Sequence, residues 1–136
     1  MMPFVSRRND TGQVVGMTSY MVIDLDNHRV EVGSTWTARS AQRTGINTAS
    51  KLLLLSHAFE ELRCIAVEFR THWMNQQSRA AIARLGAKQD GVLRNHTRAP
   101  DGTSRDTVVF SVIESEWPAV RNEFQRRLAV YARRSP

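Results

Sequence analysis

The stretch Gln42-Arg43-Thr44-Gly45-Ile46-Asn47-Thr48 runs directly into Ala49-Ser50-Lys51-Leu52-Leu53-Leu54-Leu55. A short glycine turn therefore precedes a strongly apolar helical pattern. At the start of a helix several backbone N–H groups point into one space at the positive end of the helix dipole, and this arrangement suits a phosphate. Glycine turns before helices are common, so the stretch alone leaves two interpretations open: an anion-binding loop, or a plain turn at a helix start.

The sequence on either side predicts where this stretch lies in the fold. Upstream, three strands over residues 4–8, 13–23 and 29–37 are separated by polar turns, and Asn9-Asp10-Thr11-Gly12 is a strong hairpin signal. Downstream, we expect a helix over 48–62, a strand over 65–71, a helix from Asn75 to Leu85 closed by Gly86, strands over 92–97 and 107–113, and a last helix capped by Ser115. The element order is therefore β-β-β-α-β-α-β-β-α.

This order predicts an α+β (mixed α/β) fold. The strand over 65–71 follows a crossover helix, so it should run parallel to the strand over 29–37. The loop over 38–47 then lies at the carboxyl end of a strand, where α/β sheets usually bind ligands. The first helix should bury Leu52, Leu55, Phe59 and Leu62, and the last should carry an apolar stripe from Trp117 to Tyr131 for the core or for a dimer face.

Length and composition set the outer limits. A chain of 136 residues with 41% hydrophobic and 24% charged residues fits one domain, 1–136, with one core. The single cysteine, Cys64, excludes an internal disulfide, and no segment resembles a membrane span or a signal peptide, so we expect a cytoplasmic protein. The net charge of +6 makes nucleic acid a third hypothesis, but the arginines are dispersed, which argues against it. The four histidines lack metal-like spacing, so no metal site is predicted.

Three sequence blocks together resemble the GNAT-type acyl-CoA N-acyltransferases, most closely the branch of ribosomal-protein N-terminal acetyltransferases. The family signature is Gln or Arg, two residues, Gly, one residue, then Gly or Ala; here it reads Gln42 to Asn47, with Asn47 in place of the last small residue. A second block, Asn-x-x-Ser before a helix that ends Leu-Gly, is present from Asn75 to Gly86. The closing hairpin with Pro100-Asp101-Gly102, Arg105-Asp106 and Phe110 is also similar to this branch.

The resemblance implies a GNAT-like three-layer fold whose central, mostly antiparallel sheet has one parallel, splayed strand pair. It implies acetyl-CoA as co-substrate, with the pyrophosphate held by the motif that begins at Gln42, through the backbone N–H groups of Arg43, Thr44, Gly45, Ile46, Asn47 and Thr48. The Arg43 side chain would add charge to the phosphates. The pantetheine arm would enter the splay, with Asn75 and Ser78 facing the arm and the thiol. Simple helix capping is the alternative for these two residues.

The chemistry implied by the resemblance is direct attack of a primary amine on a thioester. The amine must be neutral to attack, and Glu31 matches the position of a general base in this branch. The alternative for Glu31 is an exposed residue of an alternating strand. Ser78 would donate a hydrogen bond to the leaving thiolate, and backbone N–H groups around Trp36 and Thr37 would stabilise the oxyanion.

The family also has a strand and a helical pair ahead of the residues with which this sequence begins, and these helices form one wall of the acceptor cleft. A short form, a misassigned start and a wall supplied by another chain are all open. The leading hypothesis is an acetyl-CoA-dependent N-acetyltransferase acting on a primary amine of a protein N-terminus or a small molecule. The alternative is an inactive CoA-binding or assembly module, and a homodimer is left open by the exposed meander edge.

Overall fold

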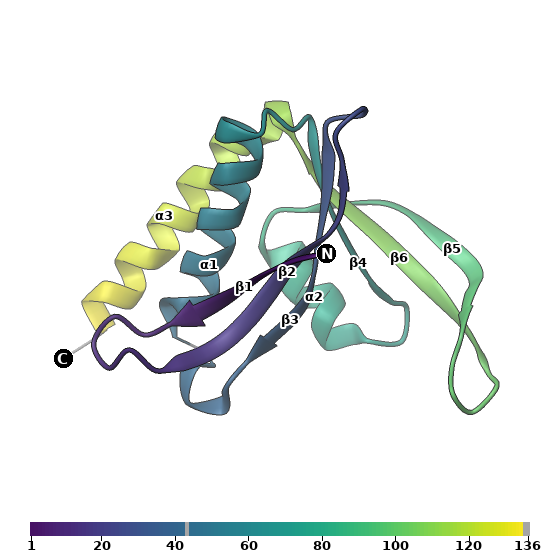
Figure 1. Ribbon diagram of the computed structural model, residues 1–136, viewed down its shortest axis with the longest axis horizontal. Helices are drawn as coiled ribbons and strands as arrows, with labels where there is room; N and C mark the ends of the chain where they lie inside the picture. The colour runs from purple at the N-terminus through teal and green to yellow at the C-terminus, as the bar shows by residue number, and fades with distance from the viewer. Residues whose placement is uncertain (43, 135–136) are drawn as a thin grey trace.

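The computed structural model of the protein describes residues 1–42 and 44–134, with the backbone alone at residues 34–37, 41 and 134. Six strands form one sheet in the order β1-β2-β3-β4-β6-β5 (Figure 1). The strands are β1 (Met2–Arg7), β2 (Val14–Asp24), β3 (Arg29–Thr37), β4 (Ala66–His72), β5 (Lys88–Arg98) and β6 (Ser104–Ile113). The α-helices are α1 (Gly45–Ser56), α2 (Gln76–Arg84) and α3 (Trp117–Arg134). The predicted element order and the mixed α/β class are confirmed.

The central strand pair, β3 and β4, is parallel, as the sequence predicted. Its ladder runs only from Arg29 opposite Ala66 to Val32 opposite Phe69. Beyond this point β3 continues to Thr37 in antiparallel register with β2, and β4 continues to His72 in antiparallel register with β6. The two strands therefore part after four paired positions and leave a gap at their carboxyl ends.

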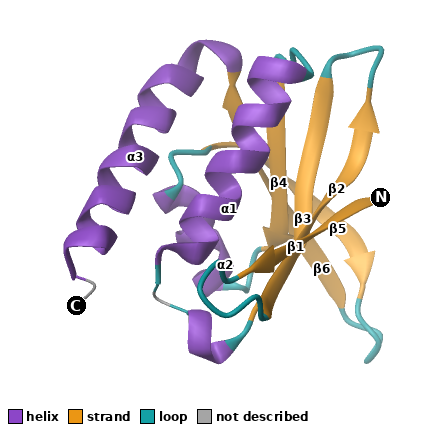
Figure 2. Ribbon diagram, turned by 60° about the vertical axis from the view of Figure 1, so that its left-hand side comes forward, coloured by secondary structure: helices purple, strands orange, loops and turns teal. Residues whose placement is uncertain are grey.

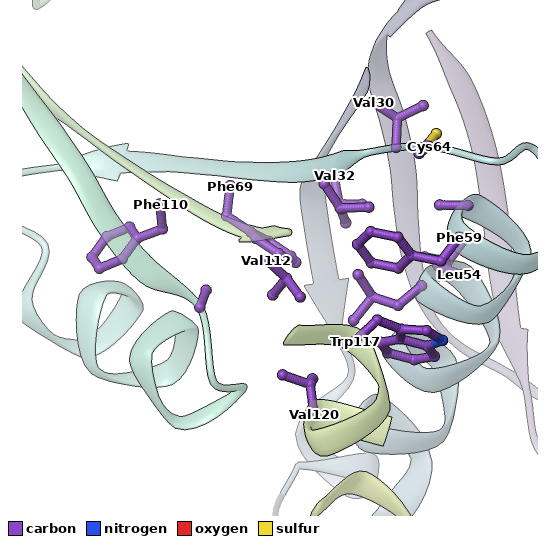
Figure 3. Close-up of a cluster of buried hydrophobic side chains, with 14 of the residues drawn as sticks. Val30, Val32, Leu54, Phe59, Cys64, Phe69, Phe110, Val112, Trp117 and Val120 are labelled. Carbon is purple, nitrogen blue, oxygen red and sulfur yellow. The ribbon is translucent and has the colours of Figure 1, made fainter. Parts of the chain in front are cut away.

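The three α-helices lie on one face of the sheet, so the described residues form two of the three layers that the resemblance implies (Figure 2). Side chains from this face and from all three helices form one buried cluster (Figure 3). Two members of this cluster, Val32 and Phe69, form the last pair of the parallel ladder. Two others, the Phe59 and Trp117 rings, stack with centroids 5.3 Å apart. The core thus lies directly beneath the point where β3 and β4 part.

Helix α1 differs from its prediction at both ends. It begins at Gly45 instead of Thr48, with Thr44 as its N-cap, and it ends in a π-helical turn over His57–Glu61. A π turn inserts one extra residue, which shifts the residues after it around the helix axis. The prediction that Leu62 is buried is therefore wrong, because 36% of this residue is exposed.

The buried face of α1 also carries a residue that the sequence did not place there. Leu53 is 71% exposed, whereas Leu54 and Leu55 are buried, and Lys51 is buried with them. Four consecutive leucines place an apolar side chain on every face of a helix, so the periodicity of this run alone did not define the buried side. The structure defines it through β2, where the Tyr20 hydroxyl donates a hydrogen bond to the Leu54 carbonyl at 2.5 Å.

Helix α2 has the ends that the sequence predicted. The Asn75 side chain accepts a hydrogen bond from the Ser78 N–H at 3.1 Å, and Gly86 ends the helix with a φ of +97°. Helix α3 buries Trp117, as predicted, but a 3-10 turn over Glu114–Glu116 precedes it instead of a Ser115 cap. Among the described residues, none of the helices combines the length and the apolar character needed to cross a membrane.

We predict that Gly86→Ala destabilises the fold by about 1–2 kcal/mol, because an L-residue is strained at its positive φ. A Cβ there would also lie only 3.1 Å from Val120 Cγ2. Gly102→Ala isolates the strain, since Gly102 has a φ of +88° in open space, and it should cost roughly 1 kcal/mol. Gly91→Ala, in open space without a positive φ, should change stability by less than about 0.5 kcal/mol. Urea unfolding of the three variants checks this order, and equal losses at positions 86 and 91 would contradict it.

Candidate functional site

A cavity of about 220 Å³ lies at the gap between β3 and β4 on the helix side of the sheet. Both strands, α1 and α2 supply its wall, which consists of Val32, Gly33, Asn47, Lys51, Phe69, Arg70, Ser78, Ala81, Ile82 and Leu85. The cavity exists because the parallel ladder ends at Val32 and Phe69 while the two helices remain packed beneath it. It brings together two residues that the sequence singled out, Asn47 and Ser78.

The first turn of α1 forms one end of this site. The Thr44 hydroxyl accepts a hydrogen bond from the Ile46 N–H at 3.3 Å. The other N–H groups of a first helical turn, at Gly45 and Asn47, have no acceptor within the helix, so they are available to an anion. The Gln42 N–H is instead directed back to the carbonyls of Ala38 and Arg39.

Two other residues of the predicted pyrophosphate cradle, Arg43 and Thr48, do not belong to this group of N–H donors. Arg43 lies outside the described residues. Thr48 is the fourth residue of α1, where helix geometry directs its N–H to the Thr44 carbonyl. The predicted cradle from Arg43 to Thr48 is thus concentrated, among the described residues, on the first turn of the helix.

The backbone of β3 beyond Val32 forms one edge of the gap, and β4 forms the other. Trp36 and Thr37 pair with Met17 and Gly16 of β2, while no partner from β4 faces them in the described ladder. Successive residues of a strand direct their N–H groups to opposite edges, so this segment presents backbone donors to the gap. The side chains of Trp36 and Thr37 lie outside the described part of the chain.

Lys51 is the residue of this cavity that the sequence analysis missed. It is only 5% exposed, and burial lowers its pKa to about 8. Its ammonium donates a hydrogen bond to the Thr18 hydroxyl at 2.9 Å, and Thr18 in turn donates to the Gly33 carbonyl at 3.5 Å. Gly33 is the first residue of β3 beyond the parallel ladder, so Lys51 is tied to the point where the strands part. The spacing from Lys51 to Leu55 was the available signal, because these residues share one helix face.

Glu31 lies on the opposite face of the sheet from this cavity. Its neighbours Val30 and Val32 point into the helix-covered core, and strand alternation sends Glu31 the other way. There it faces Glu68 across the parallel ladder, and Arg70 Nε lies 3.5 Å from the Glu31 carboxylate. Arg70 also pairs with Glu68, and Arg29 Nη2 lies 3.1 Å from Glu68 Oε2.

These four charged side chains line a second hollow, of about 240 Å³, together with Val22, Asp24 and Val30. Arg70 lines both this hollow and the helix-side cavity, so the two spaces border the same residue of β4 from opposite faces of the sheet. Burial raises the pKa of Glu31, the nearby Arg70 guanidinium opposes this shift, and the Glu68 carboxylate adds to it. A carboxyl with a raised pKa is a better proton acceptor than an ordinary one, as a general base requires.

Asn75 does not join the other predicted site residues. Asn75 caps α2 with its side chain and lines a separate hollow of about 640 Å³ with His72, Trp73 and the turn end of the β5–β6 hairpin. The structure therefore places Asn75 and Ser78 at different spaces, although they are neighbours in the cap. His72 and Trp73 lie at the carboxyl end of β4 in this hollow.

Comparisons with known proteins agree with this geometry. The family model described as an acetyltransferase (GNAT) domain matches residues 1–88. A Bacillus subtilis (strain 168) protein with the provisional name ribosomal N-acetyltransferase YdaF is 33% identical over 106 residues, which are 78% of this chain and 57% of that protein. The chain thus spans less than two thirds of the length of this relative.

Two solved structures share the fold. A GCN5-related N-acetyltransferase from Brucella melitensis superposes with a TM-score of 0.88 at 32% identity, over 93% of this chain and 57% of that one. A protein from T. thermophilus, named provisionally as an acetyltransferase, superposes with a TM-score of 0.78 at 39% identity, over 85% of this chain and 61% of that one.

We predict that Glu31→Gln raises the free energy of unfolding relative to the unmodified chain, and that this gain is larger at neutral pH than in acid. Because the folded pKa of Glu31 is raised above its ordinary value of 4.5, the folded chain holds a proton that the unfolded chain has released. The ionised carboxylate therefore costs stability as the pH rises through the folded pKa, and glutamine removes this cost. Urea unfolding from neutral pH to below 4.5 measures the effect, with exposed Glu61→Gln as the charge-removal control. A variant that loses stability at neutral pH would contradict it.

Proposed function

Because the chain belongs to the GNAT acetyltransferase domain family, we propose that it binds acetyl-CoA and transfers the acetyl group to a primary amine. The observation that carries the proposal is the gap between β3 and β4. A cavity at the start of α1 lies on one face of the sheet, a hollow lined by three carboxylates and two arginines lies on the other, and Arg70 borders both. A donor and an acceptor entering from opposite faces would meet in this gap.

The cofactor half of the proposal rests on α1 and α2. The first-turn N–H groups of Gly45 and Asn47 suit the pyrophosphate, and Arg43 would add charge beside them. The arm would extend from Asn47 to Ser78, which line the same cavity. The Ser78 hydroxyl would donate a hydrogen bond to the sulfur, a leaving group whose pKa is about 8.5 by analogy with cysteine.

The acceptor half rests on the carboxylates of the second hollow. Primary amines have reference pKa values of about 8 to 10, so they arrive as cations that Asp24, Glu31 and Glu68 would attract. Glu31 would then accept the proton, directly or through water, and release the neutral amine for attack. A backbone N–H of the β3 segment around Trp36 and Thr37, at the edge that faces the gap, would stabilise the oxyanion.

The proposal also covers surroundings and assembly. Cys64 is buried, and burial raises its pKa, which disfavours the reactive thiolate, so we infer a structural role in the reducing cytoplasm. The acceptor would be a peptide N-terminus or a small-molecule amine. A homodimer remains a prediction, to be tested by the molar mass in solution.

We predict that Ala81→Leu weakens acetyl-CoA binding at least tenfold, or about 1.4 kcal/mol, because the larger side chain fills the cavity that Ala81 lines. Ala80→Leu is the matched control, since the neighbouring residue is exposed and outside this cavity wall. Isothermal titration with acetyl-CoA measures both. Equal affinities of the two variants would contradict the assignment of the cavity, and no binding by the unmodified chain would contradict the proposal.

We predict that Glu31→Gln lowers the acetyl-transfer rate by about 10²–10⁴-fold, the usual contribution of a general base, with acetyl-CoA affinity unchanged. Thiol release from acetyl-CoA is measured against a panel of peptides with free N-termini and of polyamines, using the fastest acceptor. Glu61→Gln serves as the control. Binding without turnover of any acceptor by the unmodified chain would favour a CoA-binding module over a transferase.

A further inference from the structure

We propose that Lys51 is a self-acylation site, whose ε-amine takes the acyl group from a thioester bound in the cavity between β3, β4, α1 and α2. The inference rests on the proposed function, because acetyl-CoA is the acyl donor. It goes beyond that function, because the acceptor is a side chain of the protein itself.

Lys51 is buried at the edge of this cavity, where its ammonium donates to the Thr18 hydroxyl. Only 5% of the residue is exposed, and the cavity is the space that its side chain lines. Ser78, which we place at the thioester sulfur, lines the same volume of about 220 Å³. A thioester seated beside Ser78 is therefore within reach of a flexible lysine side chain.

The choice of lysine at this position is chemically informative. The chain has 19 lysine and arginine residues, and Lys51 and Lys88 are the only lysines among them. A guanidinium stays protonated in proteins, so it supplies charge and hydrogen bonds but no nucleophile. An amine that loses its proton near neutral pH supplies a nucleophile as well.

The surroundings of Lys51 favour the neutral amine. Burial lowers its pKa to about 8, so an appreciable fraction is neutral at physiological pH. Arg70, from β4, is the other charged residue of this cavity wall among the described residues, and its guanidinium pairs with Glu31 and Glu68 on the opposite face of the sheet. Helix α1 adds Asn47, α2 adds Ser78 and β2 adds Thr18, whose side chains do not titrate in this range.

The step balances without a further reactant. Neutral Nζ attacks the thioester carbonyl carbon, the N–C bond forms, and the C–S bond breaks with its electron pair moving to sulfur. The proton lost from nitrogen goes to the thiolate or to water. The products are an Nε-acyl-lysine and the free CoA thiol. Because an amide resists hydrolysis, the acyl group stays on the chain.

The test incubates the full chain with acetyl-CoA and follows the intact mass, then maps the acetyl group by peptide mass spectrometry. We expect one acetyl group, on Lys51. Its rate should saturate with acetyl-CoA concentration, because reaction within a complex is unimolecular. The rate should rise with pH through about 8, the pKa of Lys51, and excess CoA should slow it.

Lys88 is the internal control, because its side chain is 78% exposed and pairs with Glu116 on the surface. Acetylation there should be slower and linear in acetyl-CoA concentration. The Lys88→Arg variant should keep the acetyl group and the Lys51→Arg variant should lose it. Peptide mapping of the unmodified chain also shows which lysine is acetylated, so the test does not depend on either variant.

The outcomes separate this inference from the proposed function. Acetyl-CoA binding by titration with an unmodified Lys51, or with acetylation mainly on Lys88, would overturn the self-acylation site and leave the proposed function intact. A chain that does not bind acetyl-CoA at all would overturn both.

Discussion

The structure depends on the early end of one hydrogen-bonded ladder. β3 and β4 pair through only four positions, up to Val32 and Phe69, although both strands continue. Each strand then follows its other neighbour: β3 stays with β2 as far as Thr37 opposite Gly16, and β4 stays with β6 as far as His72 opposite Thr107. The sheet thus divides into two halves that remain paired on their outer sides. The backbone edges at the gap lose their strand partners, which is costly unless other donors and acceptors meet them.

The gap positions every part of the candidate site. On the helix side, α1 follows β3 and α2 follows β4, so the starts of both helices flank the same opening. This explains why Asn47 and Ser78, far apart in sequence, share one cavity wall. On the other side, the last paired positions bring Glu31 opposite Glu68, and Arg70 links the carboxylates to the gap.

The sequence predicted the elements better than the contacts between them. Strand β3, the parallel pair and the Asn75 cap depend on local patterns and on the crossover rule, and all three were confirmed. The burial of Leu55 and Phe59 was predicted, whereas the burial of Lys51 depends on a contact with Thr18 in another strand, which the position of Lys51 on the helix does not specify. The patterns of β3 and β4 continue past the end of their parallel ladder, so the family resemblance, and not the strand patterns, indicated that this pair splays.

Gly45 begins α1, but its backbone conformation is not the one that a loop glycine suggests. A loop glycine suggests a left-handed backbone, but Gly45 is the first residue of α1 and is not among the glycines with a positive φ. A Cβ at this position would lie 3.4 Å from Leu128 Cδ2 and from Tyr131 Cβ, so the end of α3 packs against the start of α1. A Cβ alone would fit there in ordinary contact, whereas the atoms of a larger side chain would meet α3. The glycine at this position therefore lets the end of α3 pack closely against the first turn of α1.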